Sequence, residues 1–421
     1  MAIIKPFKAI RPMGQYVENV ATLPYDVFSE EEARNIVKKN PQSFLKVVRP
    51  ETVFPEGTDI YGDMVYEKAK EILDLDMKNG ILTQEENECY YIYRQIMGDR
   101  SQTGVVACFS VDDYLNNVIR KHEHTRPEKE KDRTTHIDIC SAQTGLVFLA
   151  FQEKYDISSI LAKITAKAPL YDFISADNVK QTVWKVEDAA DIDQITKAFA
   201  EMKSLYIADG HHRCASAASI CRKRRAEHPD FNGSEEFNYL LAVAFPQDQL
   251  LIYPYNRVVK DLNGLTDEKF LEEIEKNGFS VEKVSAAFIE SEKKKGSYKP
   301  AKKGEFAMYL SGNWYRLTAK TAIQKTDAVG CLDVSLLQEN ILDKILGIKD
   351  PRTDKRIEFV GGIRGFGELE KRCSQDMKVG FALYPTSMDE LFRVTDEGQV
   401  MPPKSTWFEP KLQSGLFIHR I

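Results

Sequence analysis

The chain has 421 residues, 43% of them hydrophobic and 29% charged, and a formal net charge of −6. This balance is typical of a globular protein and excludes a disordered or fibrous chain. The acidic charge argues against a general nucleic-acid binder, and the absence of a run of about 20 apolar residues argues against a membrane span. We therefore expect a soluble cytoplasmic protein with neither nucleic acid nor a membrane as its partner.

The length exceeds that of one ordinary core, because domains usually hold about 100–200 residues. We expect a catalytic and nucleotide-binding region over residues 1–258 and a C-terminal α+β lobe over residues 259–421. The seven cysteines are irregularly spaced and form no Cys-x-x-Cys pair. A disulfide framework or a cysteine-ligated zinc site is therefore not expected.

The first half of the chain mixes helices with a strand-rich block. Ser29 and Glu32 predict a capping box at the start of a helix over Glu30–Lys39. Runs of β-branched and aromatic residues predict the strands. The further elements expected here are a helix over 60–79, strands over 89–95, 104–111 and 117–124, a charged loop over 126–132, strands over 145–152 and 181–186, and a helix over 191–202.

The second half begins with a short apolar strand over 205–208, a polar turn over 209–213 and a helix over 214–225. Strands and helices are mixed throughout, which favours an α+β fold with mixed sheets over a doubly wound one. The remaining elements expected are a hairpin of 238–245 with 250–255, a helix over 266–278, a lysine-rich solvated loop or linker over 291–304, a hairpin of 305–310 with 314–317, a helix over 335–346, strands over 357–360 and 378–384, and a helix over 387–394.

The polar turn is the strongest candidate for chemistry. A helix N-terminus offers backbone N–H groups and a favourable dipole to an anion. Gly210 allows the backbone to approach a ligand closely, and Arg213 can grip phosphate oxygens with two hydrogen bonds. His211 or His212 can donate to phosphate or carry a proton, and Asp209 can act as a general base or contact Mg²⁺. The alternative is an Asp N-cap followed by two surface histidines.

A second group lies around residues 120–125. In a strand, His122 and His124 would share one face and could bind a metal, but no third ligand is evident, so no metal ligands are assigned. The alternatives are that Arg120, Glu123 and Thr125 line a nucleotide or substrate pocket, or that this is a charged edge strand.

Two further segments carry isolated candidates. Asp26 lies in a turn before the first capped helix and can serve as a base or bind a substrate amine. Lys404, in the rigid Pro-Pro-Lys-Ser-Thr segment, can contact phosphate. For each residue a purely structural place in a turn is the alternative.

Five motifs together resemble the DUF1015 family of bacterial and archaeal proteins. They are Phe7–Pro12, Leu23–Val27, His122–Thr125, Tyr206–Arg213 and Met401–Thr406. The run at 209–213 is also similar to the phosphate-binding motif of the wider ParB/sulfiredoxin-like superfamily, which includes CTP-binding partition proteins, ATP-using sulfiredoxin and kinases of free L-serine. The resemblance implies a ParB/sulfiredoxin-like strand–loop–helix core in which Gly210, His211, His212 and Arg213 hold nucleotide phosphates.

The chain departs from two of these relatives. The motif lacks the reactive cysteine that sulfiredoxin requires, and no helix-turn-helix module like that of the partition proteins is evident. The resemblance therefore implies a nucleotide-dependent phosphotransferase, a small-molecule kinase with ATP or ADP and Mg²⁺ as cofactors and free L-serine or O-phosphoserine as the favoured substrate. Asp209, Glu123 and Asp26 are its candidate catalytic residues. The alternatives are a metal-dependent phosphoester hydrolase using His122, His124 and Asp209, and a nucleotide-gated binding module without turnover.

Overall fold

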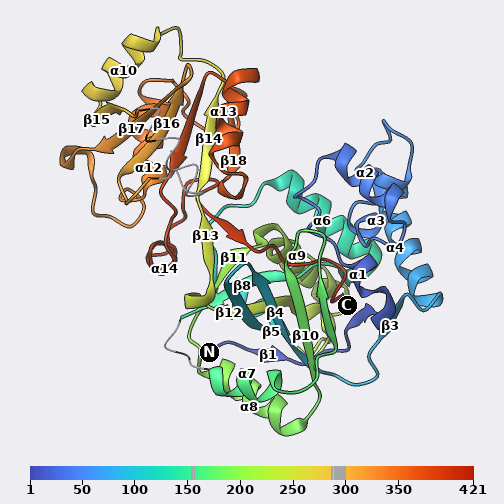
Figure 1. Ribbon diagram of the computed structural model, residues 1–421. Helices are drawn as coiled ribbons and strands as arrows, with labels where there is room; N and C mark the ends of the chain where they lie inside the picture. The colour runs from blue at the N-terminus through green and yellow to red at the C-terminus, as the bar shows by residue number, and fades with distance from the viewer. Residues whose placement is uncertain (153–154, 156, 286–287, 289–299) are drawn as a thin grey trace. The chain divides into compact units, whose positions relative to one another are not determined.

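The computed structural model describes residues 1–152, 155, 157–285, 288 and 300–421 (Figure 1). Most of the predicted lysine-rich loop at 291–304 lies outside these residues. The chain divides into two compact units, one formed by Met1–Leu250 with Pro410–Ile421 and the other by Leu251–Glu409. The last twelve residues thus belong to the same compact unit as the first 250.

The first unit is built on a nine-stranded mixed sheet with the order β6-β11-β8-β12-β5-β4-β10-β9, and β1 pairs with β5. The pairs β11–β6 and β12–β8 are parallel, and the others are antiparallel. Its strands are β1 (Ile4–Lys5), β4 (Tyr90–Met97), β5 (Arg100–Ser110), β6 (Ile119–Arg120), β8 (Val147–Phe151), β9 (Tyr171–Ile174), β10 (Lys180–Val186), β11 (Leu205–Asp209) and β12 (Tyr239–Pro246). Two short pairs accompany it, β2 (Ile10–Pro12) with β3 (Leu82–Gln84) and β7 (Ala142–Gln143) with β21 (His419–Arg420).

Helices of the first unit form two apolar clusters. In one, side chains of α7, α8 and α9 pack on the central strands β4, β5, β8 and β12. In the other, α1 to α4 and α6 pack on one another and around Ile10 and Ile418. The helices are α1 (Val17–Val20), α2 (Glu30–Lys39), α3 (Leu45–Val48), α4 (Asp63–Lys78), α5 (Val111–Leu115), α6 (Pro127–Cys140), α7 (Ser158–Thr165), α8 (Ala189–Glu201) and α9 (His211–Glu227).

The second unit is a six-stranded antiparallel sheet, with α13 packed on it through Leu369. Its strand order is β15-β17-β16-β19-β14-β18. The elements are β13 (Leu251–Tyr253), β14 (Tyr255–Val259), α10 (Asp267–Lys276), β15 (Phe279–Lys283), β16 (Glu305–Leu310), β17 (Asn313–Ala319), α12 (Asp333–Leu337), β18 (Ile357–Gly361), α13 (Phe366–Gln375), β19 (Val379–Leu383), α14 (Met388–Asp396) and β20 (Trp407–Glu409).

The protein is thus an α+β protein with a mixed central sheet, as the sequence predicts. Its second sheet is antiparallel rather than mixed. The capping box of Ser29 and Glu32 at the start of α2 and the hairpin of β16 with β17 are confirmed. Within the described part of the chain, every helix is too short or too polar to traverse a lipid bilayer.

Three sequence predictions are wrong. The strand expected over 117–124 is only β6, because β11 offers it just two partners, Leu205 and Tyr206. The charged loop expected over 126–132 is the start of α6, where Pro127 occupies the first helical turn, a position whose missing N–H costs nothing. The hairpin expected at 238–255 does not form, because β12 pairs with β5 and β8 while β13 pairs with β20.

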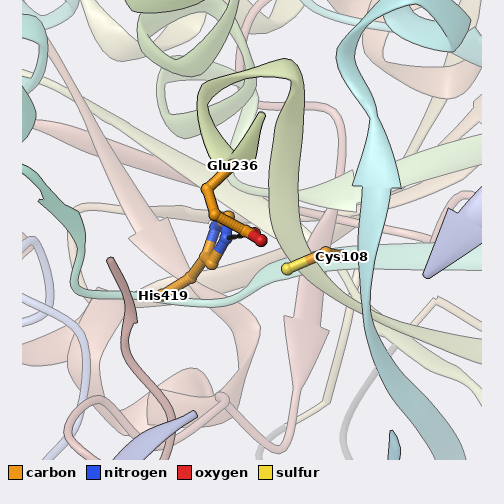
Figure 2. A group of neighbouring side chains, drawn as sticks. All are labelled: Cys108, Glu236 and His419. Atoms are coloured by element: carbon orange, nitrogen blue, oxygen red, sulfur yellow. Dashed lines mark hydrogen bonds and ion pairs between the residues drawn. The ribbon is translucent and has the colours of Figure 1, made fainter. Parts of the chain in front are cut away.

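A polar cluster joins the two ends of the chain in the first unit. Nε2 of His419 lies 2.7 Å from Oε2 of Glu236, and Nζ of Lys5 lies 2.7 Å from Oε1 of the same carboxylate. Figure 2 shows His419 and Glu236 together, with Cys108 beside them. The cluster therefore ties β1 and β21 to the segment that precedes β12.

Candidate functional site

The predicted turn at 209–213 is tighter than the sequence suggests. Asp209 is the last residue of β11, and Gly210 alone separates it from α9, which begins at His211 rather than at Cys214. Gly210 has φ of 94°, a left-handed conformation that costs a residue with a Cβ about 1–2 kcal/mol. His211, His212 and Arg213 therefore form the first helical turn, where backbone amides point out of the helix end.

Arg213 is the third residue of α9. Its Nη1 donates a hydrogen bond to the backbone oxygen of Leu146. A Cβ placed on Gly145 or on Gly210 would lie 3.5 Å from Nε and 3.6 Å from Nη1 of Arg213, respectively. The guanidinium thus packs against two glycine backbones, and the bond to Leu146 engages Nη1. Arginine is the side chain best suited to hold phosphate oxygens through its remaining N–H groups.

Asp209 is held in an ion pair that the sequence analysis missed. Its Oδ2 lies 2.8 Å from Nζ of Lys411, and its Oδ1 accepts a hydrogen bond of 2.8 Å from the amide of Gly210. Burial raises the pKa of this carboxyl group, but the positive charges of Lys411 and Arg213 outweigh burial and hold the pKa well below its ordinary value. Asp209 is therefore ionised at neutral pH and a weak proton acceptor.

The histidines of the turn contact the segment that follows β6. The rings of His211 and His122 meet edge to face at a centroid distance of 4.4 Å, and both side chains are buried. Burial and the neighbouring His211 lower the pKa of His122 to about 3, so its imidazole is neutral at physiological pH. Nε2 of His212 accepts a hydrogen bond of 3.0 Å from the amide of Arg126.

The hydrolase alternative requires a metal held by His122, His124 and Asp209, whereas the structure brings a different set of potential ligands together. Ligand atoms of His122, Glu123 and His211 lie within 4.8 Å of one another. The side chain of His124 is exposed, and Asp209 is engaged with Lys411. The alternation expected of a strand at 117–124 fails because β6 ends at Arg120.

A small, partly open pocket with a cavity volume of about 30 Å³ lies beside Arg213. Arg133 also lines it, with its charge paired to Asp132. Its lining residues are Tyr25, Val48, Arg133, His136, Ile137, Gln143, Thr144, Gly145, Val147, Arg213 and Ser414.

The far side of this pocket is fixed by α6. Arg133 is buried, donates two 3.0 Å hydrogen bonds to Asp132, and lies 4.3 Å from the ring centroid of Tyr25. Burial lowers the pKa of His136 to about 4, with Arg133 contributing, so this side chain is also neutral at pH 7. Burial raises the pKa of Tyr25 to about 12, which keeps its hydroxyl protonated as a hydrogen-bond donor.

The remaining predicted site residues occupy different surroundings. Asp26 is exposed, but it follows Tyr25 of the pocket wall directly and its charge acts on that hydroxyl. Lys404 belongs to the second unit, where its Nζ lies 5.3 Å from the ring centroid of Tyr255. A role for Lys404 in phosphate binding stays a prediction.

Sequence reasoning missed Tyr25, Arg133, His136 and Lys411. A helical reading of the segment 127–140 would have placed Arg133 and His136 within one turn of each other on α6. Nothing local in the sequence links Lys411 to Asp209, which lies 202 positions earlier.

Comparison with known proteins agrees with the motifs. The model of a family described as "Protein of unknown function (DUF1015)" matches residues 4–335, most of the chain. The chain belongs to the DUF1015 family. No curated protein matches this DUF1015 chain.

Three solved structures illustrate what the chain is similar to. A free serine kinase in complex with AMP is 13% identical, with a TM-score of 0.35 over 74% of this chain and 92% of that chain. SbnI with a C-terminal truncation, from Staphylococcus aureus, is 12% identical, with a TM-score of 0.39 over 74% and 87%. A conserved hypothetical protein from Pyrococcus furiosus is 14% identical, with a TM-score of 0.34 over 74% and 95%.

Proposed function

We propose that this DUF1015 protein is a nucleotide-dependent phosphotransferase that acts on a small hydroxy compound, with ATP or ADP as the nucleotide and Mg²⁺ as the bridging ion. The observation that carries the proposal is the strand–glycine–helix turn at 209–213, which opens with Arg213 into a pocket that also holds Arg133. Phosphoryl transfer depends mainly on positioning and charge neutralisation, which such a site supplies.

The phosphates would lie at the N-terminus of α9, in the manner of the ParB/sulfiredoxin-like superfamily. The amides of the first helical turn, the glycine backbone at 210 and the guanidinium of Arg213 would hold their oxygens, with His211 and His212 alongside. Lys404 is the further phosphate ligand that the sequence predicts.

The acidic residues divide by their surroundings. Asp209 is anchored by Lys411 and has a depressed pKa, which suits orientation of Lys411 better than proton abstraction. Contact of Asp209 with Mg²⁺ would require the ion to displace this ammonium. Asp26 carries no such anchor and follows the pocket residue Tyr25, so it is the preferred base or amine partner for the acceptor. Glu123 beside His122 and His211 is the second candidate.

The favoured acceptor is free L-serine, which the motif resemblance implies. The phenol of Tyr25, which lines the pocket, can donate a hydrogen bond to a polar group of the amino acid. The reverse reaction, which yields serine from O-phosphoserine, uses the same groups.

The test is phosphorus NMR on the purified chain with Mg²⁺, L-serine and either ATP or ADP. Phosphoserine should appear, and replacing Asp26 with Asn should slow its formation by at least about 100-fold, the usual worth of a general base. The exposed Asp248→Asn serves as the matched control and should leave the rate unchanged. Bound nucleotide without turnover on any hydroxyl acceptor would refute the proposal and favour a nucleotide-gated binding module.

A further inference from the structure

Two groups of potential metal ligands occur among the described residues, and both lie in the first unit. One is Cys108, Glu236 and His419, and the other is His122, Glu123 and His211. The two groups differ in whether a positively charged side chain already contacts the potential ligands.

The Cys108 group already contains a cation. The ammonium of Lys5 lies 2.7 Å from one oxygen of Glu236. The other oxygen of this carboxylate is 2.7 Å from His419 (Figure 2). Lys5 is also directly opposite Cys108 in the pairing of β1 with β5. A metal ion here would have to displace this ammonium or bear its repulsion, so the group is a structural ion-pair network.

The His122 group has a different composition. It combines two buried imidazoles with one half-buried carboxylate, and no lysine or arginine forms an ion pair with Glu123 in the described part of the chain. The ring of His122 also hydrogen-bonds to the backbone of Ile207 in β11. Such a bond fixes the tautomer of a metal-binding histidine and directs its lone pair.

We propose that His122, Glu123 and His211 form a site for a zinc-class divalent cation at the start of α9. Two imidazoles and one carboxylate match the three protein ligands of a zinc site with an open position, whereas Mg²⁺ prefers oxygen ligands alone. Tetrahedral ligands at about 2.0–2.1 Å from zinc stand roughly 3.4 Å apart. The three ligand atoms lie within 4.8 Å of one another, so they must close by no more than about 1.4 Å to take the ion. A metal bound at Nε2 of His211 would replace the long hydrogen bond of 3.4 Å that this atom accepts from the amide of His122.

The position gives the ion a role. His211 is the first residue of α9, two residues before Arg213, so the open coordination position lies on the same helical turn that the proposed function assigns to phosphates. The helix dipole disfavours a cation at this end of the helix, and the negative charge of Glu123 offsets that effect. The site would take a phosphate oxygen or a water molecule as its fourth ligand. This role rests on the proposed function, but metal binding itself does not require a nucleotide.

The test is titration of the full-length, tag-free, chelator-treated chain with Zn²⁺ alone, followed by calorimetry and metal analysis. One equivalent should bind, and Glu123→Gln, a half-exposed change that spares the core, should weaken binding by at least about 100-fold. His211→Asn should do the same. His124→Gln, at the exposed histidine next in sequence, and Cys108→Ala should leave the affinity unchanged.

X-ray absorption at the zinc edge provides the second readout. Only nitrogen and oxygen ligands at about 2.0–2.1 Å are expected, without a sulfur ligand near 2.3 Å. No binding by the wild-type chain, unchanged binding in Glu123→Gln, or a sulfur ligand that disappears in Cys108→Ala would each overturn the inference. Because nucleotide is absent throughout, these results are independent of whether the chain transfers phosphate.

Discussion

Arg213 gives the sharpest test of the phosphate site. Arg213 lies on the first turn of α9, and its side chain lines the pocket. Replacing it with alanine therefore removes a positive charge from the proposed phosphate site. Nη1 donates to Leu146 in the free protein, so the ligand loses the hydrogen bonds that the rest of the guanidinium is proposed to make. Hydrogen bonds to a charged group are worth about 1.5–3 kcal/mol, so the Kd for ADP or ATP should rise roughly 10- to 150-fold.

The measurement is isothermal calorimetry at fixed salt with Mg²⁺ and either nucleotide. Arg222→Ala is the matched control, because it removes an exposed arginine from the same helix. Arg213→Lys should recover only part of the affinity, since an ammonium cannot make the bidentate contact. Loss of the bond to Leu146 should cost about 0.5–1.5 kcal/mol of stability, which urea unfolding reports separately. Unchanged nucleotide affinity in a folded Arg213→Ala variant would refute the assignment of this turn to phosphate.

Three further predictions concern stability and are all measured by urea unfolding. Gly210→Ala should destabilise the chain by about 1–2 kcal/mol because φ is 94° there, whereas Gly14→Ala, at a position without that conformation, should change stability by less than about 0.5 kcal/mol. Because the pKa of Asp209 is depressed, its ion pair stabilises the folded chain at pH values above the ordinary carboxyl pKa of about 4, and this stabilisation is lost as the pH falls further. Lys411→Met should therefore reduce the dependence of the unfolding free energy on pH in the acid range. An unchanged dependence would contradict the ion pair. The pKa of His136 is about 4 in the folded chain and about 6.5 in the unfolded chain, so between these pH values the folded chain binds fewer protons. The free energy of unfolding should therefore rise with pH across this window by up to about 3 kcal/mol, and His136→Asn should remove that rise.

Local signals explain which elements were predictable. The capping box of α2 depends on residues three positions apart, and β11 with α9 depends on an apolar strand, one glycine and a helix in sequence. Such local patterns do not depend on which distant segments pack against them. The start of α6 was misjudged because its residues form no clear apolar stripe, so its charged first turn reads as a loop.

The site was predictable only in part, because its second half comes from distant segments. The turn at 209–213 could be located from its residue types alone. Its ion-pair partner Lys411 and its pocket neighbours Tyr25 and Arg133 come from segments that only the fold brings together. The grouping of His122 with His211 was missed for the same reason, since a periodicity argument compares residues only within one element.

The return of Pro410–Ile421 to the first unit has a consequence for the order of synthesis. These residues supply Lys411 to Asp209 and pair His419 with Gln143, yet they leave the ribosome after the whole of Leu251–Glu409. The second unit can fold while the chain is still being made, because its residues are contiguous. The turn at 209–213 reaches its final electrostatic state only after Lys411 has been synthesised, so a nascent or prematurely ended chain carries Asp209 without this counter-ion.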